Sequence, residues 1–303
     1  MREINFNKFY KVFNSASVLL VLISLLFLIF KGLNYGIDFK GGTLIELRID
    51  NKNLKISDIR SSINSLNLGD VSVKQFGTET DYLIKFEKKL DKSYTLEQIK
   101  KDIKKIISEE VDFRRVENVG PKISSELLMS SLIAISLSLA AMLIYVWIRF
   151  EWQFSLGAIL ALFHDVITTI GLFVFTGLEF NLSTVAAVLT IAGYSVNDTV
   201  VVFDRVRENL RKSKSIDQSS IINKSLNDTL SRTITTSVTT LLALLAIYFV
   251  GGEVISDFTL AMIWGVMIGT YSSIFVASAF LTFFNLRRTR EEEKEDLNYF
   301  NNE

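Results

Sequence analysis

The stretch Val12–Phe30, VFNSASVLLVLISLLFLIF, decides the fold class because it carries no charge between Lys11 and Lys31. The hydrocarbon core of a bilayer is about 30 Å thick, and a helix needs about 20 apolar residues to cross it. The stretch therefore predicts a membrane-spanning helix. No small-residue cleavage site follows it, so we expect an uncleaved anchor rather than a signal peptide.

Five further apolar stretches of similar length follow along the chain. They are Leu127–Ile148, Phe154–Gly177, Leu182–Phe203, Thr233–Val250 and Phe258–Phe284. The chain is 49% hydrophobic and 22% charged, so apolar and charged residues are segregated, as in a membrane protein with water-exposed parts. We expect an all-α membrane bundle of six transmembrane helices.

The orientation follows from basic residues, which favour the cytoplasmic side in short connections. They gather in the N-terminus, in the connection after the fourth span and in the tail, whereas the short links near Glu179 and at 251–256 have none. Both termini are therefore expected in the cytoplasm. The expected parts are a cytoplasmic N-terminus (1–11), the first span (12–30), an outer domain (31–125), spans two to four (126–203), a cytoplasmic link (204–232), spans five and six (233–284) and a cytoplasmic tail (285–303).

The outer domain alternates strand and helix patterns. Strands are expected at Leu44–Ile49, Val71–Phe76, Tyr82–Phe86 and Val111–Val116. Ser57 is expected to cap the first helix, Thr95 with Gln98 forms a capping-box pattern for the second, and Pro121 suits the first position of the helix that leaves the domain. The order β-α-β-β-α-β predicts a small α+β domain of the ferredoxin-like type. The alternative is any other small α+β domain, and we find no catalytic constellation in it.

The composition excludes several chemistries. The chain has no cysteine and one histidine, which rules out thiol nucleophiles and Cys-ligated metals and makes a His-based metal site improbable. Its net charge of zero argues against nucleic acid as a partner. No G-x-x-x-x-G-K-[ST] motif is present, so ATP is not the expected direct fuel. We expect no cofactor, no metal and no enzymatic site, and an ion gradient remains as the energy source.

Ionisable residues inside the predicted spans are functional candidates, because a charge at the bilayer centre costs at least ~2.5–3.5 kcal/mol. Asp198 shares one helix face with Thr190, Tyr194 and Asn197. Span three has Asp165 beside His164. The fifth span begins after Arg232 and carries a stripe of threonines at helical spacing, Thr235, Thr236, Thr239 and Thr240.

These polar stripes predict a shared wet interior and a proton or cation pathway. In this interpretation the proton occupancy of Asp198 depends on its distance from Arg232. A static ion pair between the two residues is the alternative, and Arg232 alone is also compatible with a cytoplasmic positive anchor. His164 and Asp165 are also compatible with simple helix–helix contacts. Small residues at a spacing of four, Gly265, Gly269, Ser273 and Ala277, indicate close packing of span six, internally or with a partner.

Several motifs resemble those of the SecD/SecF family of bacterial preprotein translocase subunits. The first is G-x-D-F-x-G-G-T, present as Gly36, Asp38, Phe39, Gly41, Gly42 and Thr43. The others are Val119-Gly120-Pro121, the run from Gly193 to Asn209, the threonine-rich start of span five, Gly251-Gly252, and Gly265 to Ala279. The resemblance covers nearly the whole chain. The outer region of SecD is far larger, so the chain is similar to the F-type half alone.

The resemblance implies a function. Such a subunit pairs with SecD as a heterodimer, is related to the resistance–nodulation–division exporters, and uses the proton motive force to draw preproteins across the bacterial inner membrane after the ATP-driven step of SecA. The implied partners are SecD, the SecYEG channel, SecA through the shared reaction, YajC and YidC, the preprotein and membrane lipid. The outer domain would be periplasmic. The family assigns proton passage to the positions of Asp198 and Arg232. The polar residues of the spans add Asn197, Asp165, His164 and Thr236 as further candidates. A small-molecule exporter and a structural subunit without proton flux are the alternatives.

Overall fold

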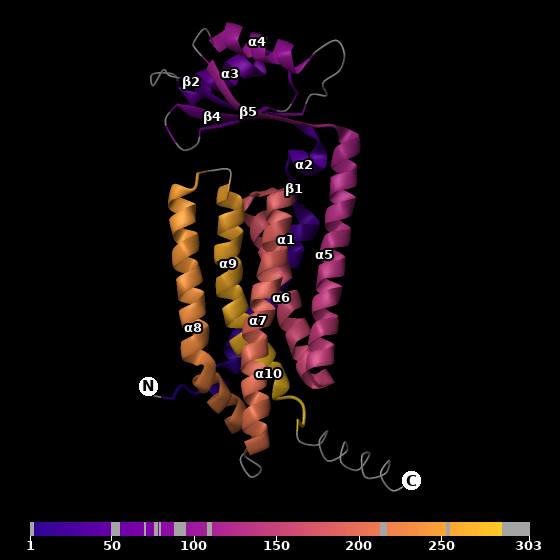
Figure 1. Cartoon of the computed structure of the whole chain (residues 1–303), viewed down its shortest axis with the longest axis vertical. Coiled ribbons are helices and arrows are strands. Elements are labelled where there is room, and N and C mark those ends of the chain that lie inside the picture. Colours follow the sequence, from indigo (N-terminus) through magenta and orange to yellow (C-terminus); the bar gives the residue numbers. More distant parts are fainter. Residues whose placement is uncertain are drawn as a thin grey trace.

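The computed structural model describes residues 3–49, 55–69, 71–75, 78, 80–87, 95–107, 111–212, 217–252 and 255–286. They form a bundle of long helices with a small α+β domain at one end (Figure 1). Most of the expected tail, including the acidic run 291–296, lies outside these residues.

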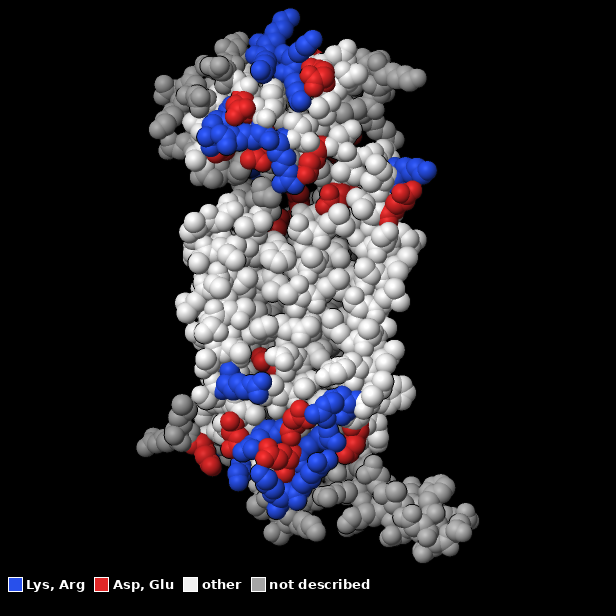
Figure 2. Space-filling view, in the orientation of Figure 1, with Lys and Arg blue, Asp and Glu red and all other residues white. Residues whose placement is uncertain are grey.

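Six helices of the described part are long and apolar enough to cross a membrane, which confirms the six predicted spans. They are α1 (Tyr10–Phe30), α5 (Pro121–Arg149), α6 (Trp152–Thr176), α7 (Leu182–Lys212), α8 (Gln218–Val250) and a last span made of α9 (Ser256–Ser272), a π-helical turn (Ser273–Ala277) and α10 (Ser278–Leu281). Charged side chains gather at the two ends of the molecule, with a broad, largely uncharged belt between them (Figure 2). The described residues of the link 204–232 are helical except for Asp217, the N-cap of α8, because α7 and α8 extend beyond the predicted spans.

The bundle has a central group of helices and a peripheral group. More than half of the apolar windows of α6, α7 and α9 are buried, whereas α1, α5 and α8 are mostly exposed. The buried residues of α1 are Tyr10, Ser17 and Ser24, which recur every seven residues; Ser24 lies against Gly171 of α6, and the Ser17 hydroxyl bonds to Tyr271 of α9. Such small residues let two helices approach closely.

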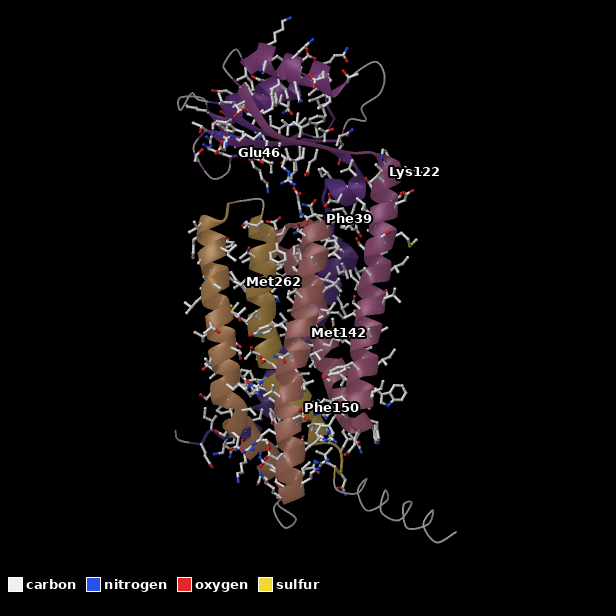
Figure 3. All side chains as sticks on the ribbon, in the orientation of Figure 1. Phe39, Glu46, Lys122, Met142, Phe150 and Met262 are labelled. Carbon is white, nitrogen blue, oxygen red and sulfur yellow. The ribbon has the colours of Figure 1, made fainter. Side chains whose placement is uncertain are left out.

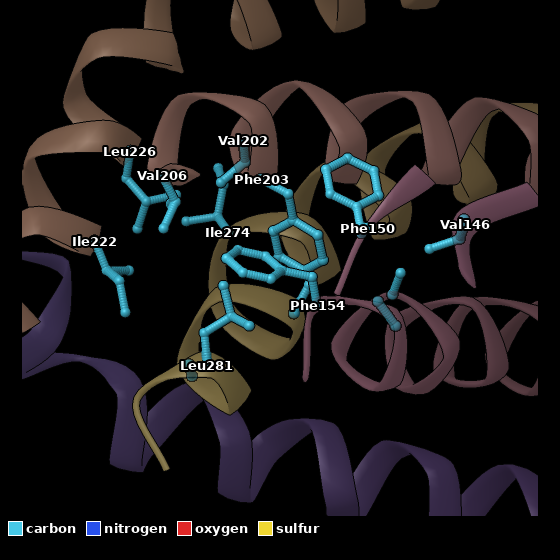
Figure 4. Packing of buried hydrophobic residues seen from close by; sticks show 14 of the residues in the cluster. Val146, Phe150, Phe154, Val202, Phe203, Val206, Ile222, Leu226, Ile274 and Leu281 are labelled. Carbon is cyan, nitrogen blue, oxygen red and sulfur yellow. The ribbon is translucent and has the colours of Figure 1, made fainter. Parts of the chain in front are cut away.

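The end of the bundle away from the outer domain has an aromatic and aliphatic core. Phe154 contacts Phe203 edge to face at 5.3 Å between ring centroids, and Phe150 packs beside both (Figure 4). The N-terminal segment, which includes a 3-10 turn (Phe6–Lys8), is fixed to α8 at this end. The Asn227 side chain accepts from the backbone N–H of Ile4 and donates to its carbonyl, both at 2.8 Å.

The outer domain contains a four-stranded antiparallel sheet in the order β3-β4-β2-β5. Its elements are β2 (Gly42–Ile49), α3 (Ile56–Asn64), β3 (Val71–Gln75), β4 (Asp81–Phe86), α4 (Leu96–Ile107) and β5 (Val111–Val119). They follow the expected order. Helices α3 and α4 cover the face of the sheet that points away from the bundle (Figure 1), and their isoleucines pack on it in one core.

Two of the three predicted helix starts in this domain are confirmed, and one is wrong. Pro121 is the first residue of α5, as predicted, and the Thr95 N–H donates to Gln98 Oε1 at 2.7 Å, as a capping box requires. The prediction for Ser57 was wrong: α3 begins at Ile56, Lys55 is its N-cap, and no side chain caps it. The Ser57 hydroxyl bonds instead to the neighbouring carboxylate.

Candidate functional site

The glycine-rich motif after α1 joins the outer domain to the bundle. It forms the short helix α2 (Ile37–Lys40), and Asp38 Oδ2 accepts a hydrogen bond from the N–H of Leu182, the first residue of α7, at 3.0 Å. Phe39 is buried and packs on Phe180, with 5.9 Å between the rings. Figure 3 shows Phe39 at the junction of the two parts. A carboxylate at a helix N-terminus is stabilising, so the motif supports the start of α7.

The two glycines of the motif are required by their backbone. Gly41 has φ = 80° and Gly42 has φ = 141°, values that side chains rarely adopt. A Cβ on Gly42 would also lie 2.7 Å from the carbonyl oxygen of Phe86. The next residue, Thr43, is buried and donates to Asn118 Oδ1 at 3.1 Å. The motif therefore acts as a structural joint that starts β2.

A second connection lies beneath the sheet. A parallel pair of short strands, β1 (Asn34–Tyr35) and β6 (Glu179–Phe180), holds the α6–α7 turn against the exit of α1. Lys85 on β4 forms an ion pair with Glu179, whose N–H donates to Asp257 Oδ2 of α9 at 3.3 Å. A cavity of about 310 Å³ opens beside this ion pair and is lined mainly by polar and charged side chains of both parts.

Asp165 is the centre of a buried polar cluster among the three central helices. Its side chain is fully buried and accepts from the hydroxyls of Ser195 on α7 and of Ser272 on α9, the latter at 2.7 Å. The other carboxylate oxygen lies 2.9 Å from Nδ1 of His164. The second ring nitrogen, Nε2, is buried and has no hydrogen-bond partner in the described part. The structure thus brings the two candidates of span three together.

Asp198 lies in a separate polar group. The residue is buried, and its Oδ2 accepts a hydrogen bond from the hydroxyl of Thr270 on α9 at 3.3 Å. Thr270 Oγ1 lies 2.6 Å from Ser237 Oγ on α8, and Ser237 accepts from the Tyr194 hydroxyl at 3.4 Å. No ion pair reaches Asp198 within the described ranges. Three helices therefore supply hydroxyl groups around one carboxyl group at membrane depth.

Arg232 and most of the predicted threonine stripe of α8 lie on the surface of this chain, whereas Thr229 and Thr233 of the same helix are buried. Arg232, Asn197 and Thr236 are exposed on the bundle surface, and the Thr236 hydroxyl donates back to the Arg232 carbonyl at 2.8 Å. The stripe of α8 thus does not join the interior of this chain, because helical spacing groups residues on a face without saying where that face points, and its part in a shared pathway stays a prediction. In the described part, Arg232 forms no ion pair with Asp198.

Sequence reasoning missed the hydroxyl partners of the two carboxylates. Ser195, Ser272, Thr270 and Ser237 carry no charge, and serine and threonine are ordinary residues of membrane helices. The sequence signal that could have found them was the stripe of small residues at Gly265 and Gly269, which marks the face of α9 that packs closely on its neighbours. A Cβ on Gly265 would lie 2.2 Å from Ile191 of α7. The stripe thus packs internally, and this close approach brings α9 hydroxyls to both carboxylates.

The donor set offers little to a metal or a cofactor. Within the described ranges, no group of three or more His, Cys, Asp or Glu side chains has the arrangement of a metal site. The groups present at membrane depth are carboxyls, hydroxyls and one imidazole. These groups exchange protons and form hydrogen bonds.

Comparison with known proteins places the chain in a family. Residues 98–287 match the family described as "Protein export membrane protein SecD/SecF, C-terminal", and residues 26–52 match the SecD/SecF GG motif. The protein translocase subunit SecF of Rickettsia felis is 43% identical over 94% of this chain and 93% of its own length. That of Magnetococcus marinus is 48% identical over 87% of this chain and 86% of its own.

Solved structures agree with this assignment. The crystal structure of SecDF from Thermus thermophilus, a translocon-associated membrane protein, superimposes with a TM-score of 0.82 at 36% identity over 92% of this chain. The chain spans 38% of the length of that protein. A super-membrane-facing form of SecDF gives a TM-score of 0.70 over 97% of this chain and 40% of the other. The chain is a multi-pass membrane protein of protein transport and belongs to the SecD/SecF family.

Proposed function

We propose that this translocase subunit works with SecD and uses the proton motive force to promote preprotein translocation after the ATP-driven step of SecA. The observation that carries the proposal is the pair of buried carboxyl groups, Asp165 and Asp198, at membrane depth. An unpaired charge there is costly, and a proton is the smallest ligand that removes it. Each proton that crosses 100 mV releases about 2.3 kcal/mol, which is available for a conformational change.

The proposal includes a location and a topology. The chain lies in the bacterial inner membrane with both termini in the cytoplasm and the outer domain in the periplasm. The distribution of basic residues supports this orientation. We assign the outer domain to the ferredoxin-like type, which the strand order β3-β4-β2-β5 and the two helices on one face of the sheet support.

The exposed polar stripe of α7 and α8 supports SecD as the partner that covers it. Asn197, Arg232 and Thr236 lie on this surface, and such groups are unfavourable against lipid. The longer SecDF chain, of which this chain spans 38%, has the additional length for such a partner. Family resemblance extends the partners to the SecYEG channel, SecA, YajC and YidC. Arg232 would then act at the interface with SecD, close to the proton pathway that includes Asp198.

The test is Asp198→Asn in the complete translocase, because asparagine keeps the shape and cannot titrate. We expect loss of the part of preprotein export that a protonophore abolishes in the wild type, with the ATP-driven part retained. The matched control is Asp204→Asn, which changes a carboxylate paired with Arg149 outside the predicted span. Gradient-dependent export at the full rate in Asp198→Asn would refute the proton role and leave a scaffold.

A further inference from the structure

Three hydroxyl groups form a continuous hydrogen-bonded line that ends on Asp198. The line runs from the Tyr194 hydroxyl to Ser237 Oγ (3.4 Å), from Ser237 to Thr270 Oγ1 (2.6 Å), and from Thr270 to Asp198 Oδ2 (3.3 Å). Its members come from α7, α8 and α9. A hydroxyl donates one proton and accepts others, so each member can pass a proton to the next oxygen.

The line connects a partly exposed position at membrane depth to the interior of the bundle. Tyr194 is half-buried, whereas Ser237 and Asp198 are buried. Tyr194 lies four residues before Asp198 on α7, and is therefore about 6 Å nearer to the outer domain. Beside it, a Cβ on Gly193 would find no atom within 4 Å. The line therefore starts at the exposed face of α7 and α8, which the proposed partner would cover, and ends inside the bundle.

Ser237 has two alternative acceptors. Its hydroxyl lies 2.8 Å from the carbonyl oxygen of Thr233 and 2.6 Å from Thr270 Oγ1. A rotation about one bond of Ser237 therefore connects or interrupts the line. This rotation requires no movement of the helices.

The cluster of Asp165 has no comparable exit. The Ser195 and Ser272 hydroxyls both donate to Asp165, and both residues are buried. Among the described residues, no hydroxyl line leads from this cluster to an accessible tyrosine. The two carboxyl groups therefore differ in their hydroxyl connections, and the line serves Asp198.

We propose that Tyr194, Ser237 and Thr270 form a hydroxyl relay through which Asp198 exchanges protons with the exposed face of α7 and α8, one helical turn nearer to the outer domain. The relay rests on the proposed use of protons at Asp198. In one passage, a hydronium ion gives a proton to Tyr194 and becomes water, Tyr194 gives its own proton to Ser237, Ser237 gives its own to Thr270, and Thr270 gives its own to the carboxylate. The hydroxyls are chemically unchanged, and rotation restores their hydrogen bonds for the next proton.

The decisive variants separate a hydroxyl role from a packing role. Thr270→Val keeps the shape and removes the hydroxyl, whereas Thr270→Ser keeps the hydroxyl and removes a methyl group. Gradient-dependent preprotein translocation is measured with the complete translocase in proteoliposomes. Positioned proton transfer is worth at least about 100-fold in rate, so we expect Thr270→Val to slow this part at least tenfold and Thr270→Ser to stay within about threefold of wild type.

The other members and a control complete the test. Ser237→Ala and Tyr194→Phe should slow the same part, and the ATP-driven part should not change. The control is Thr199→Val, because the Thr199 hydroxyl pairs with Ser273 between the same helices at 2.8 Å without touching the relay. Wild-type rates in Thr270→Val, or a Thr270→Ser that is as slow as Thr270→Val, would overturn the relay. If Asp198→Asn also keeps the gradient-dependent rate, the proposed function itself fails; if Asp198→Asn loses it, only the relay fails.

Discussion

Replacing Gly171 by alanine should destabilise the bundle at the contact between α1 and α6. A Cβ on Gly171 would lie 2.2 Å from Oγ, 2.4 Å from Cβ and 3.0 Å from Cα of Ser24. Rotating the serine hydroxyl relieves only the first of these contacts. The two helix backbones must therefore move apart, and α6 carries the Asp165 cluster.

The size of the effect follows from two opposing terms. Inserting a methyl group into a close-packed contact costs about 1–3 kcal/mol. Alanine is favoured over glycine in a helix interior by up to ~1 kcal/mol. Gly193→Ala measures the second term alone, because nothing lies within 4 Å of its Cβ position. The two variants should therefore differ by about 1–3 kcal/mol, or roughly 5- to 150-fold in the unfolding constant.

The assay is reversible unfolding of the purified chain in one detergent, followed for the wild type and both variants. Ser24→Gly supplies the compensation, since it removes the Cβ and Oγ that the new methyl group meets. The double variant Ser24→Gly/Gly171→Ala should recover at least half of the loss, which appears as a coupling energy in the mutant cycle. If Gly171→Ala is as stable as Gly193→Ala, the close approach of α1 and α6 is wrong.

Three further predictions concern the outer domain and its joint. Arg48 donates two hydrogen bonds to Asp81, at 2.7 and 2.8 Å, which hold the pKa of that carboxyl below its usual value. The resulting stability is present above the usual carboxyl pKa of about 3.9 and is lost as the pH falls through the lowered pKa. Amide exchange in β2 should therefore accelerate less on acidification in Asp81→Asn than in the wild type. Lys85→Met should broaden the spin-label distance distribution between α4 and α8, because it removes the ion pair with Glu179, and an unchanged distribution would contradict this connection. Asp38→Ala should accelerate hydrogen exchange of the first amides of α7 by about 2- to 30-fold, since such a cap is worth about 0.5–2 kcal/mol, whereas Asp38→Asn should largely retain protection.

The spans were predictable because membrane solvent imposes a length and a composition on each helix separately. Val12–Phe30 can be recognised without knowing any neighbour. The strands of the outer domain were predictable for a similar reason, since alternation at Ile45 and Leu47 reports a face buried in a sheet. Both residues are fully buried in the core beneath α3 and α4.

The partners of the carboxyl groups were not predictable in the same way. Ser272 lies 107 residues from Asp165 in sequence, and only the packing of α9 against α6 and α7 brings their side chains together. The direction of a helix face is equally a property of the assembled bundle. Spacing predicted Asn197 and Asp198 on one face of α7, yet Asn197 is exposed and Asp198 is buried. The π-helical turn at Ser273–Ala277 has no signal in the sequence pattern.

One turn of α9 contacts both carboxyl groups, which gives the last span a particular position in the molecule. Thr270 donates to Asp198 on α7, and Ser272 donates to Asp165 on α6. Gly269 lies against Ser195, with 3.1 Å between a Cβ there and that of the serine, so α9 has little room to slide along α7. Because both donors belong to one rigid turn, a displacement of this turn toward one carboxyl changes its distance to the other. The π-helical turn begins at the next residue, Ser273, where a helix bends more readily than in its regular part. A change of proton occupancy at either carboxyl group therefore acts on the same turn, and the turn lies beside the one place in α9–α10 where the backbone departs from regular α-helix.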